Sequence, residues 1–310
     1  FHKVTQNIKE LLKQIIPKPI LINAWAFYSR SKAYTARQAF DSAPKEPQWL
    51  TIKELEQLQA HYSLADLSYC YDRESLENRA RKRVSELISM ARRQAGSMDY
   101  FLELGSWDGM VCSLLREMGK VAIGIDYRTH GFTDQAIASG TLLAGMDARY
   151  LGFGDNTFDF VFSYNSFEHF RDPNLVLSEA ARVVRPGGSI FMSFGPLWLS
   201  PKGAHQYKSI TVPYCECLFP LTLIEDFARE RGLNLIDFAQ MNKWTLSQYR
   251  DLWSKFSDRL DLVTYYETYN ADHVDLIIRY PSCFKSKTAV FDDLIISNID
   301  VLFIKHHRSP

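Results

Sequence analysis

The feature that most constrains the fold is the pattern that begins at Tyr100. From there on, short apolar runs alternate with Gly- and Asp-containing turns and helix-like segments, which is typical of βαβ units in a mainly parallel sheet. Asp172 and Pro173 are suited to begin one helix as N-cap and first residue, and Pro186-Gly187-Gly188 ends it. A second helix is predicted over 221–231. Strands are predicted over 100–104, 121–125, 158–163, 189–194 and 234–238.

Residues 1–98 show a different, helix-like pattern. Apolar residues fall at helical spacing over 8–15 and again over 74–94, where arginines surround the apolar stripe. The apolar run 20–27 is much shorter than the roughly 20 residues that a membrane span needs, so we predict that it is core.

These two patterns predict a division of the chain after residue 98. We expect a helical N-terminal extension or cap over 1–98 and an α/β domain over 99–310, with a doubly wound, Rossmann-like, mainly parallel sheet. Within that domain, 99–195 would form the cofactor half and 196–310 the substrate-side elements. A C-terminal antiparallel strand pair is predicted from two β-like runs, 273–280 and 299–305.

Charge and cysteine content argue against several classes of protein. Thirty-six Lys and Arg balance 36 Asp and Glu, so no net charge attracts nucleic acid or an anionic membrane. The five cysteines are odd in number and scattered, as expected in a reducing compartment such as the cytoplasm. Cys215 and Cys217 lack a second ligand pair, so we predict packing thiols and no metal site. We predict no membrane span, and leave open a homodimer and a segment preceding Phe1.

A candidate cofactor site follows the first predicted strand. Gly105 and Gly109 stand four residues apart, so the backbone can pass close to a ligand where a Cβ would collide. Asp126 follows the second strand, where a carboxylate can accept hydrogen bonds from a ribose diol. A dinucleotide site would need a glycine where Trp107 stands, and Asp108 would repel a pyrophosphate at the helix start. A positively charged sulfonium tolerates both residues, and the Trp107 ring attracts cations.

Six motifs then follow one another in a recognisable order and spacing. They are FLELGSWDG at 101–109, GID at 124–126, GMDA at 145–148, NTFDFV at 156–161, FEHF at 167–170 with DP at 172–173, and RVVRPGG at 182–188. Over about residues 99–195, the chain thereby resembles the class I S-adenosylmethionine-dependent methyltransferases of the UbiE or type 11 group.

The resemblance implies that the cofactor is S-adenosylmethionine and that S-adenosylhomocysteine is the product. Asp126 would bind the ribose hydroxyls, and Tyr127 would flank the adenine. Asp147, with the backbone amide of Ala148, would meet the adenine amino group. The resemblance also implies contacts with the cofactor along its methionine part, in the glycine turn and near the sulfonium. The residues implied for these contacts are Glu103, Gly105, Ser106, Trp107, Gly109, Tyr164 and Asn165.

Methyl transfer is an in-line displacement, so positioning supplies most of the catalysis, up to about 7–11 kcal/mol, and a base is optional. For an alcohol acceptor, a histidine adds about 10²–10⁴-fold. The two candidates are His169, after the fourth strand, and His205, in a loop rich in Pro, Trp and Tyr. The many aromatic side chains, which could wall an acceptor pocket, and the long segment after the motifs favour a small or glycan acceptor. We predict O-methylation of a sugar or small-molecule metabolite.

Other classes of function are left open. An NAD-type oxidoreductase shares the strand, the glycine turn and the acid, but not the later motifs. A cofactor-binding subunit without an acceptor site would keep the pocket and lose turnover. Methylation of arsenic or another metal would need several cooperating thiols, and only Cys215 and Cys217 stand close together in the sequence.

Overall fold

The structure is a computed structural model that describes residues 17–46, 48–62, 72–93, 98–206 and 208–307. The chain forms two compact units, each built from three segments. The helical unit comprises Phe1–Ser63, Leu199–Leu235 and Tyr266–Asn298, and the sheet unit comprises Leu64–Trp198, Ile236–Tyr265 and Ile299–Pro310. The division predicted after residue 98 stays a prediction, and the helix predicted over 8–15 lies outside the described residues.

The sheet unit holds the strands of a single sheet. They are β1 (Tyr100–Leu104), β2 (Val121–Asp126), β3 (Leu142–Gly145), β4 (Phe158–Tyr164), β5 (Val184–Phe194), β6 (Leu260–Tyr269) and β7 (Ile296–Lys305). Residues 266–269 of β6 and 296–298 of β7 belong to the helical unit. Its helices are α5 (Arg73–Ala91), α6 (Met110–Glu117), α7 (Asp134–Ala138), α8 (Pro173–Val183) and α11 (Leu246–Lys255), with the 3-10 turns η1 (Thr129–Gly131), η2 (Phe167–His169) and η3 (Phe238–Gln240).

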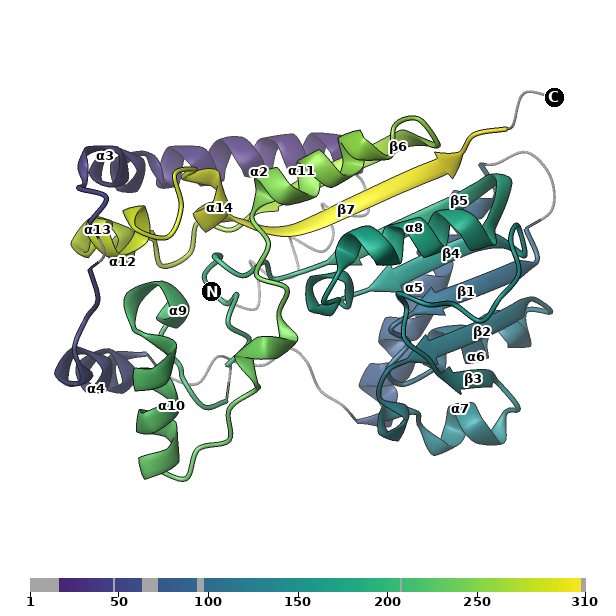
Figure 1. The fold of residues 1–310 in the computed structure, drawn as a ribbon, viewed down its shortest axis with the longest axis horizontal. Helices are drawn as coiled ribbons and strands as arrows, with labels where there is room; N and C mark the ends of the chain where they lie inside the picture. Colours follow the sequence, from purple (N-terminus) through teal and green to yellow (C-terminus); the bar gives the residue numbers. More distant parts are fainter. Residues whose placement is uncertain (1–16, 47, 63–71, 94–97, 207, 308–310) are drawn as a thin grey trace. The chain divides into compact units, whose positions relative to one another are not determined.

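The strand order is β3-β2-β1-β4-β5-β7-β6 (Figure 1). Strands β1 to β5 are parallel, and the chain moves outward from β1 through α6 to β2, and outward in the other direction from β4 through α8 to β5. Because parallel crossovers are right-handed, α6 and α8 cover opposite faces. This confirms the predicted doubly wound fold. The direction of winding changes between β1 and β4, the position at which such sheets bind ligands.

Helix α5 covers part of the sheet with the apolar stripe that its sequence predicts. Asp72 caps the helix by accepting a hydrogen bond from the Ser75 N–H at 2.9 Å. The stripe packs into one core with the side chains of β1, β4 and α6, and Arg83 of α5 lies over the ring of Tyr164, 4.7 Å from its centroid. The buried stripe residues are Ala80, Val84, Leu87 and Ala91.

The end of α8 differs from the prediction. Asp172 accepts the Leu175 N–H and Pro173 begins the helix, as predicted, but the helix ends at Val183. Pro186-Gly187-Gly188 therefore lies inside β5. A Cβ on Gly188 would lie 2.8 Å from the Asp159 carbonyl oxygen, so the glycine allows β5 to approach β4 closely.

Two C-terminal predictions are wrong. Residues 273–280 form helix α12 (Val274–Arg279), because Val274 and Ile277 are buried at helical spacing whereas Asp275 is exposed. Residues 234–238 are not a strand, since the Asp237 side chain accepts the Ala239 N–H and begins η3. The run 299–305 is confirmed as part of β7, which pairs with β5 in antiparallel register and has β6 on its other side.

The helical unit is built from short helices. They are α2 (Lys18–Lys32), α3 (Tyr34–Ser42), α4 (Ile52–His61), α9 (Cys215–Leu218), α10 (Leu221–Glu230), α12, α13 (Pro281–Lys285) and α14 (Asp292–Ile295). The prediction that 20–27 is core is wrong in part, because α2 buries Ser29 and leaves Ile20 and Phe27 58% and 78% exposed. Cys215 and Cys217 are free, buried thiols of α9.

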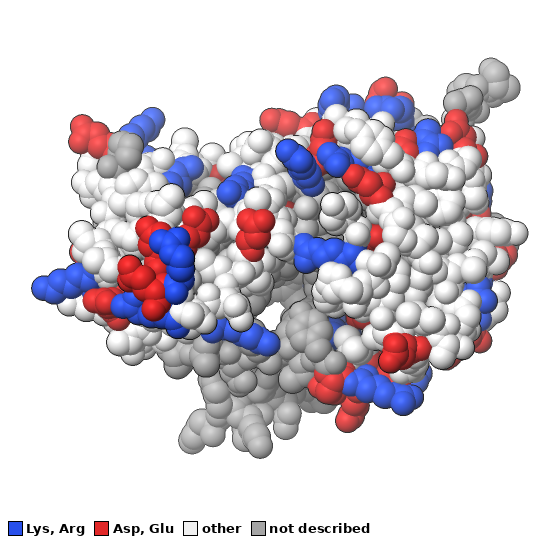
Figure 2. Space-filling model, turned by 60° about the horizontal axis from the view of Figure 1, so that its bottom comes forward, with Lys and Arg blue, Asp and Glu red and all other residues white. Residues whose placement is uncertain are grey.

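The surface carries charges of both signs. Lys and Arg side chains are interspersed with Asp and Glu over the face shown in Figure 2, as the balanced composition leads one to expect. None of the helices in the described parts of the chain is long and apolar enough to cross a membrane.

Candidate functional site

Two glycines shape the turn between β1 and α6. Gly105 has a φ of +73°, and its N–H and the Ser106 N–H both donate to the Ile125 carbonyl at 2.9 Å. A Cβ on Gly105 would lie 2.5 Å from the Cβ and Oγ of Ser166, which leaves no room for a side chain. Gly109 also has a φ of +73° and begins α6. The conformation of the turn therefore requires glycine at both positions.

Asp126 ties this turn to the loop after β2. Its Oδ2 accepts the Trp107 N–H at 2.9 Å, and its Oδ1 accepts the Arg128 N–H at 2.8 Å. Each carboxylate oxygen can still accept a further hydrogen bond. Trp107 has a φ of +43°, which is strained for a residue with a side chain, and its ring meets His130 edge-on. The large residue in the glycine turn is thus accommodated by packing on η1.

The two acids of the predicted site, Asp126 and Asp147, reach the same edge of the sheet. Asp126 stands opposite Gly145 in the parallel β2–β3 register, and the Met146 N–H donates to the Asp126 carbonyl at 3.0 Å. Asp147 forms an ion pair with Arg149 at 2.7 Å, and this hydrogen bond lowers the pKa of Asp147. The loops after β2 and β3 that carry the two acids are therefore adjacent at this edge of the sheet.

Four other predicted site residues lie at or directly after the ends of β2, β3 and β4. Tyr127 is 82% exposed, whereas Ala148 is buried. Tyr164 is buried, and its hydroxyl donates to the Glu86 carboxylate of α5 at 3.0 Å. Asn165 has a φ of +49° and stands directly after β4, where its backbone N–H bonds to β5. The Tyr164 hydroxyl is thus held by α5, while Asn165 lies at the edge of the sheet.

The negative charges of Asp108 and Asp126 act on the buried Glu103 beside the glycine turn. Glu103, at the end of β1, is buried and accepts a hydrogen bond from the Cys112 thiol at 3.3 Å. Burial, reinforced by the negative charges of Asp108 and Asp126, raises the pKa of Glu103 to about 8. Burial also raises the pKa of Asp108. A cation bound here would relieve this repulsion, and a pyrophosphate would add to it.

The charged and hydrogen-bonding groups of the turn and of the β2 loop decide which cofactor fits. S-adenosylmethionine carries a ribose diol, which can donate hydrogen bonds to Asp126, and a sulfonium and an ammonium, whose positive charges would favour the ionised form of Glu103. In addition, the Ser106 hydroxyl in the turn is buried without a hydrogen-bond partner among the described groups. The residues of the turn and of the β2 loop therefore fit this cofactor better than they fit a dinucleotide.

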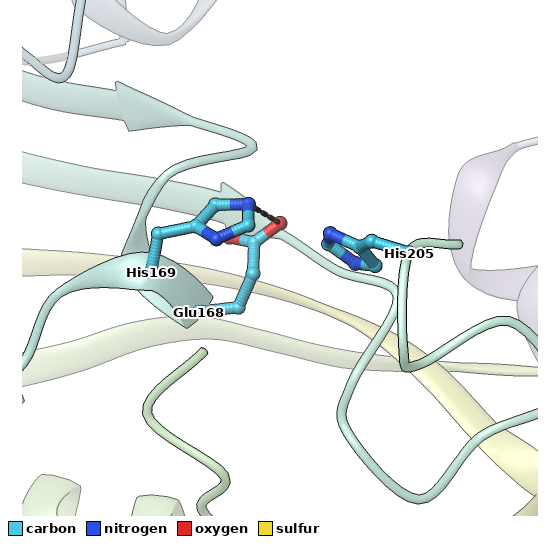
Figure 3. A group of neighbouring side chains, drawn as sticks. All are labelled: Glu168, His169 and His205. Carbon is cyan, nitrogen blue, oxygen red and sulfur yellow. Dashed lines mark ion pairs between the residues drawn. The ribbon is translucent and has the colours of Figure 1, made fainter. Parts of the chain in front are cut away.

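Glu168 and His169 follow β4 on η2 (Figure 3). The Glu168 side chain is buried, and its Oε1 accepts the Gly195 N–H at 3.1 Å and lies 4.0 Å from Nε2 of His169. Burial raises the pKa of Glu168 to about 8. Burial also lowers the pKa of His169, so the imidazole is neutral at neutral pH. A neutral imidazole and a carboxyl group thus stand together at the carboxyl edge of the sheet.

A segment far away in sequence orients His169. Its Nδ1 lies 3.2 Å from the Gln240 carbonyl oxygen, and the Gln240 side chain accepts a hydrogen bond from Arg128 at 2.6 Å. The sequence does not predict the contact between Gln240 and His169, because the contact uses the main-chain carbonyl oxygen, which every residue type has. Glu168 was also not predicted as a site residue, although the motif at 167–170 contains it.

His205, the other predicted base, belongs to the helical unit and is described there by itself. It stands in the loop before α9 with a φ of +56°, and its N–H donates to the Lys202 carbonyl at 3.1 Å. The same loop is held by the Tyr214 N–H, which donates to the Pro201 carbonyl at 3.0 Å. The side chain of His205 is buried, not exposed as a plain surface loop would leave it.

Comparison with known proteins agrees with this geometry. Residues 102–192 match the family described as methyltransferase domain. A ubiquinone biosynthesis O-methyltransferase from Brucella anthropi is 25% identical over 181 residues, which are 51% of this chain and 67% of that protein. A protein of the same name from Rhizobium leguminosarum bv. trifolii is 29% identical over 192 residues, which are 52% of this chain and 73% of that protein.

Two solved structures resemble this chain in fold but have low sequence identity to it. A phosphoethanolamine N-methyltransferase 2 from Haemonchus contortus, in complex with S-adenosylmethionine, is 16% identical with a TM-score of 0.45, covering 72% of this chain and 53% of that chain. The YcgJ protein from Bacillus subtilis is 15% identical with a TM-score of 0.44, covering 73% of this chain and 99% of that chain.

The family match falls on the strands and loops that carry the glycine turn, both carboxylates and the Glu168-His169 pair. The doubly wound sheet and the donor set of the turn agree with it. Residues 102–192 are therefore similar to the methyltransferase domain family, and the fold and binding groups of this part of the chain fit S-adenosylmethionine-dependent methyl transfer.

Proposed function

We propose that the chain transfers a methyl group to a hydroxyl oxygen of a small-molecule or glycan acceptor. The relatives from Brucella and Rhizobium are named O-methyltransferases, which supports oxygen as the acceptor atom. The observation that carries the proposal is the place of His169 on η2, where Nδ1 lies 3.2 Å from the Gln240 carbonyl oxygen and burial lowers the pKa of the imidazole. Such a group suits methylation of an alcohol, which must lose its proton. When bound, S-adenosylmethionine supplies a methyl group activated by the adjacent positive sulfur.

The proposed cofactor site is built from the glycine turn and the loops after β2, β3 and β4. Asp126 would accept hydrogen bonds from the ribose hydroxyls with the lone pairs that its backbone donors leave, and Asp147 would meet the adenine amino group beside the Ala148 amide. Glu103 would complement the positive charge of the methionine part. The remaining proposed contacts are Gly105, Ser106, Trp107, Gly109, Tyr127, Tyr164 and Asn165.

His169 is suited to act as the base because its tautomer is fixed. A carbonyl oxygen can only accept a hydrogen bond, so the contact with Gln240 requires the hydrogen on Nδ1. The lone pair is then on Nε2, where it can take the proton of an acceptor hydroxyl. His205 remains the alternative base, supported by its place in the aromatic-rich loop that follows the sheet edge.

Methyl transfer to oxygen is tested by incubating the protein with S-adenosylmethionine and each member of two panels, phenols such as catechol and sugars such as methyl glucoside. We expect S-adenosylhomocysteine and an O-methylated product, both identified by mass spectrometry. A methyl group found on nitrogen or carbon would refute the proposed acceptor atom.

Replacement of His169 by Ala is expected to lower kcat by about 10²–10⁴-fold if Nε2 is the base, because the proton then has no positioned acceptor. Affinity for S-adenosylmethionine, measured by calorimetry, should stay within about twofold. His205→Ala is the matched comparison. If His205→Ala causes the larger loss of kcat and His169→Ala leaves it unchanged, the assignment passes to His205.

Asp126→Ala is expected to raise the Kd for S-adenosylmethionine by about 10- to 100-fold, because charge-assisted hydrogen bonds worth about 1–3 kcal/mol are lost. Isothermal titration calorimetry measures the change. Asp134→Ala, an exposed acid at the start of α7, serves as the control and should leave the Kd unchanged. Equal affinities in the wild type and Asp126→Ala would show that Asp126 does not bind the cofactor.

A further inference from the structure

One oxygen of the Glu168 carboxyl group has no hydrogen-bond partner among the residues that the structure describes. Oε1 accepts the Gly195 N–H at 3.1 Å, but Oε2 is buried and makes no hydrogen bond with the described residues. The side chain as a whole is only 1% exposed. A buried polar atom left without a hydrogen bond costs about 1–3 kcal/mol, so such atoms persist chiefly where a ligand completes them.

Glu168 lies at the edge of the sheet, in the loop that contacts the glycine turn. Gly195 directly follows β5, so the hydrogen bond from its N–H holds Glu168 between the ends of β4 and β5. Ser166, two residues before Glu168, donates to the Gly105 carbonyl at 3.0 Å. The loop that carries Glu168 is therefore in contact with the glycine turn, at the edge where doubly wound sheets bind their ligands.

The backbone around Glu168 is fixed from a separate part of the sheet unit. The Asn242 N–H donates to the Glu168 carbonyl at 2.9 Å, and the Asn242 side chain donates to the Phe167 carbonyl at 3.0 Å. Asn242 in turn accepts a hydrogen bond from the Tyr249 hydroxyl of α11 at 3.0 Å. These contacts hold the main chain of the loop, while the hydrogen bond from the Gly195 N–H holds Oε1 of the side chain.

We propose that Oε2 of Glu168 binds the acceptor's hydroxyl group and presents it to Nε2 of the neighbouring His169. The inference rests on the proposed O-methylation and adds to it the residue that selects a hydroxyl-bearing acceptor. Oε2 accepts the hydrogen bond of the hydroxyl while the acceptor binds, and the O–H then turns to Nε2 of His169. His169 would take this proton as the oxygen–methyl bond forms and the methyl–sulfur bond of S-adenosylmethionine breaks, with S-adenosylhomocysteine as the leaving group. An acceptor without a hydroxyl leaves Oε2 unpaired and is rejected.

The test compares Glu168→Gln with Glu216→Gln in the full chain loaded with S-adenosylhomocysteine. Glu216 is a suitable control because it is equally buried, yet both its oxygens accept hydrogen bonds from thiols, those of Cys215 and Cys217. Thermal unfolding is recorded with catechol and with methyl glucoside as hydroxyl-bearing probes. At least one probe should raise the Tm of the wild type and of Glu216→Gln, but not that of Glu168→Gln.

Equal stabilisation of all three proteins, or no stabilisation of the wild type by either probe, would overturn the proposal. It would also fail if Mg²⁺ alone raised the Tm of the wild type and not of Glu168→Gln, since the partner of Oε2 would then be a cation. For a turned-over acceptor, we expect Glu168→Gln to raise the acceptor KM about tenfold while the Kd for S-adenosylmethionine stays the same. Probe binding through Glu168 without any methyl transfer would refute the proposed function and leave this inference standing.

Discussion

Gly105→Ala is expected to weaken the binding of S-adenosylmethionine about 100-fold and to lower the stability of the sheet unit. A side chain at φ +73° costs about 1–2 kcal/mol by itself. The new Cβ would also lie 2.5 Å from Ser166, so the loop after β4 must move and its hydrogen bond to the Gly105 carbonyl is lost. Calorimetric titration and urea unfolding measure the two effects.

Gly119→Ala is the matched control for this change. Gly119 has a φ of +81°, but nothing lies within 4 Å of the position that a Cβ would take. The control therefore carries the conformational cost of about 1–2 kcal/mol without the collision, and it should bind the cofactor normally. If both variants lost affinity equally, the contact with Ser166 would not be the cause.

Stability is expected to fall as the pH rises from 5 to 8, which is the reverse of ordinary acid denaturation. Burial raises the pKa of Glu103 from 4.5 to about 8, so the folded chain keeps a proton that the unfolded chain has released. Between these two pKa values the folded state binds more protons, and the free energy of unfolding decreases with pH. Glu103 alone accounts for about 3 kcal/mol over this range.

Glu103→Gln should remove that share of the pH dependence, because glutamine does not titrate. Urea unfolding at pH 5, 6, 7 and 8 gives the slope, and Glu225→Gln, an exposed change on α10, should keep the slope of the wild type. Glu168 and Glu216 have their pKa values raised to about 8 in the same way, so a reduced slope remains in Glu103→Gln. An unchanged slope would mean that Glu103 is ionised in the folded protein.

The sheet could be predicted because the apolar pattern of most strands is visible in the sequence. Every residue of β4 is buried, so its apolar run is nearly continuous, as expected of a central parallel strand. The glycine turn was predictable for a similar reason, since only glycine meets the steric demand at Gly105. By contrast, β3 is short and only half-buried, and no strand was predicted from its pattern.

The remaining errors arise where tertiary contacts decide the outcome. The run 273–280 has enough apolar residues for a strand or a helix, and burial of Val274, Leu276 and Ile277 selects the helix. On α2, apolar residues point away from the buried face, which no rule of amphipathicity anticipates. The proposed role of Gln240 depends on its main-chain carbonyl oxygen. That of Glu168 depends on one carboxyl oxygen without a hydrogen bond to the described residues, and neither feature can be recognised in a sequence.

The position of β7 has a consequence for how the protein is made. Although it is the last strand along this sequence, β7 lies between β5 and β6 and is not an edge strand. A ribosome therefore has to synthesise residues up to Lys305 before the sheet can close, and until then β5 and β6 expose unpaired edges. A chain truncated near residue 295 would carry every proposed catalytic residue and yet be prone to aggregate, because it lacks the strand that pairs with β5 and β6.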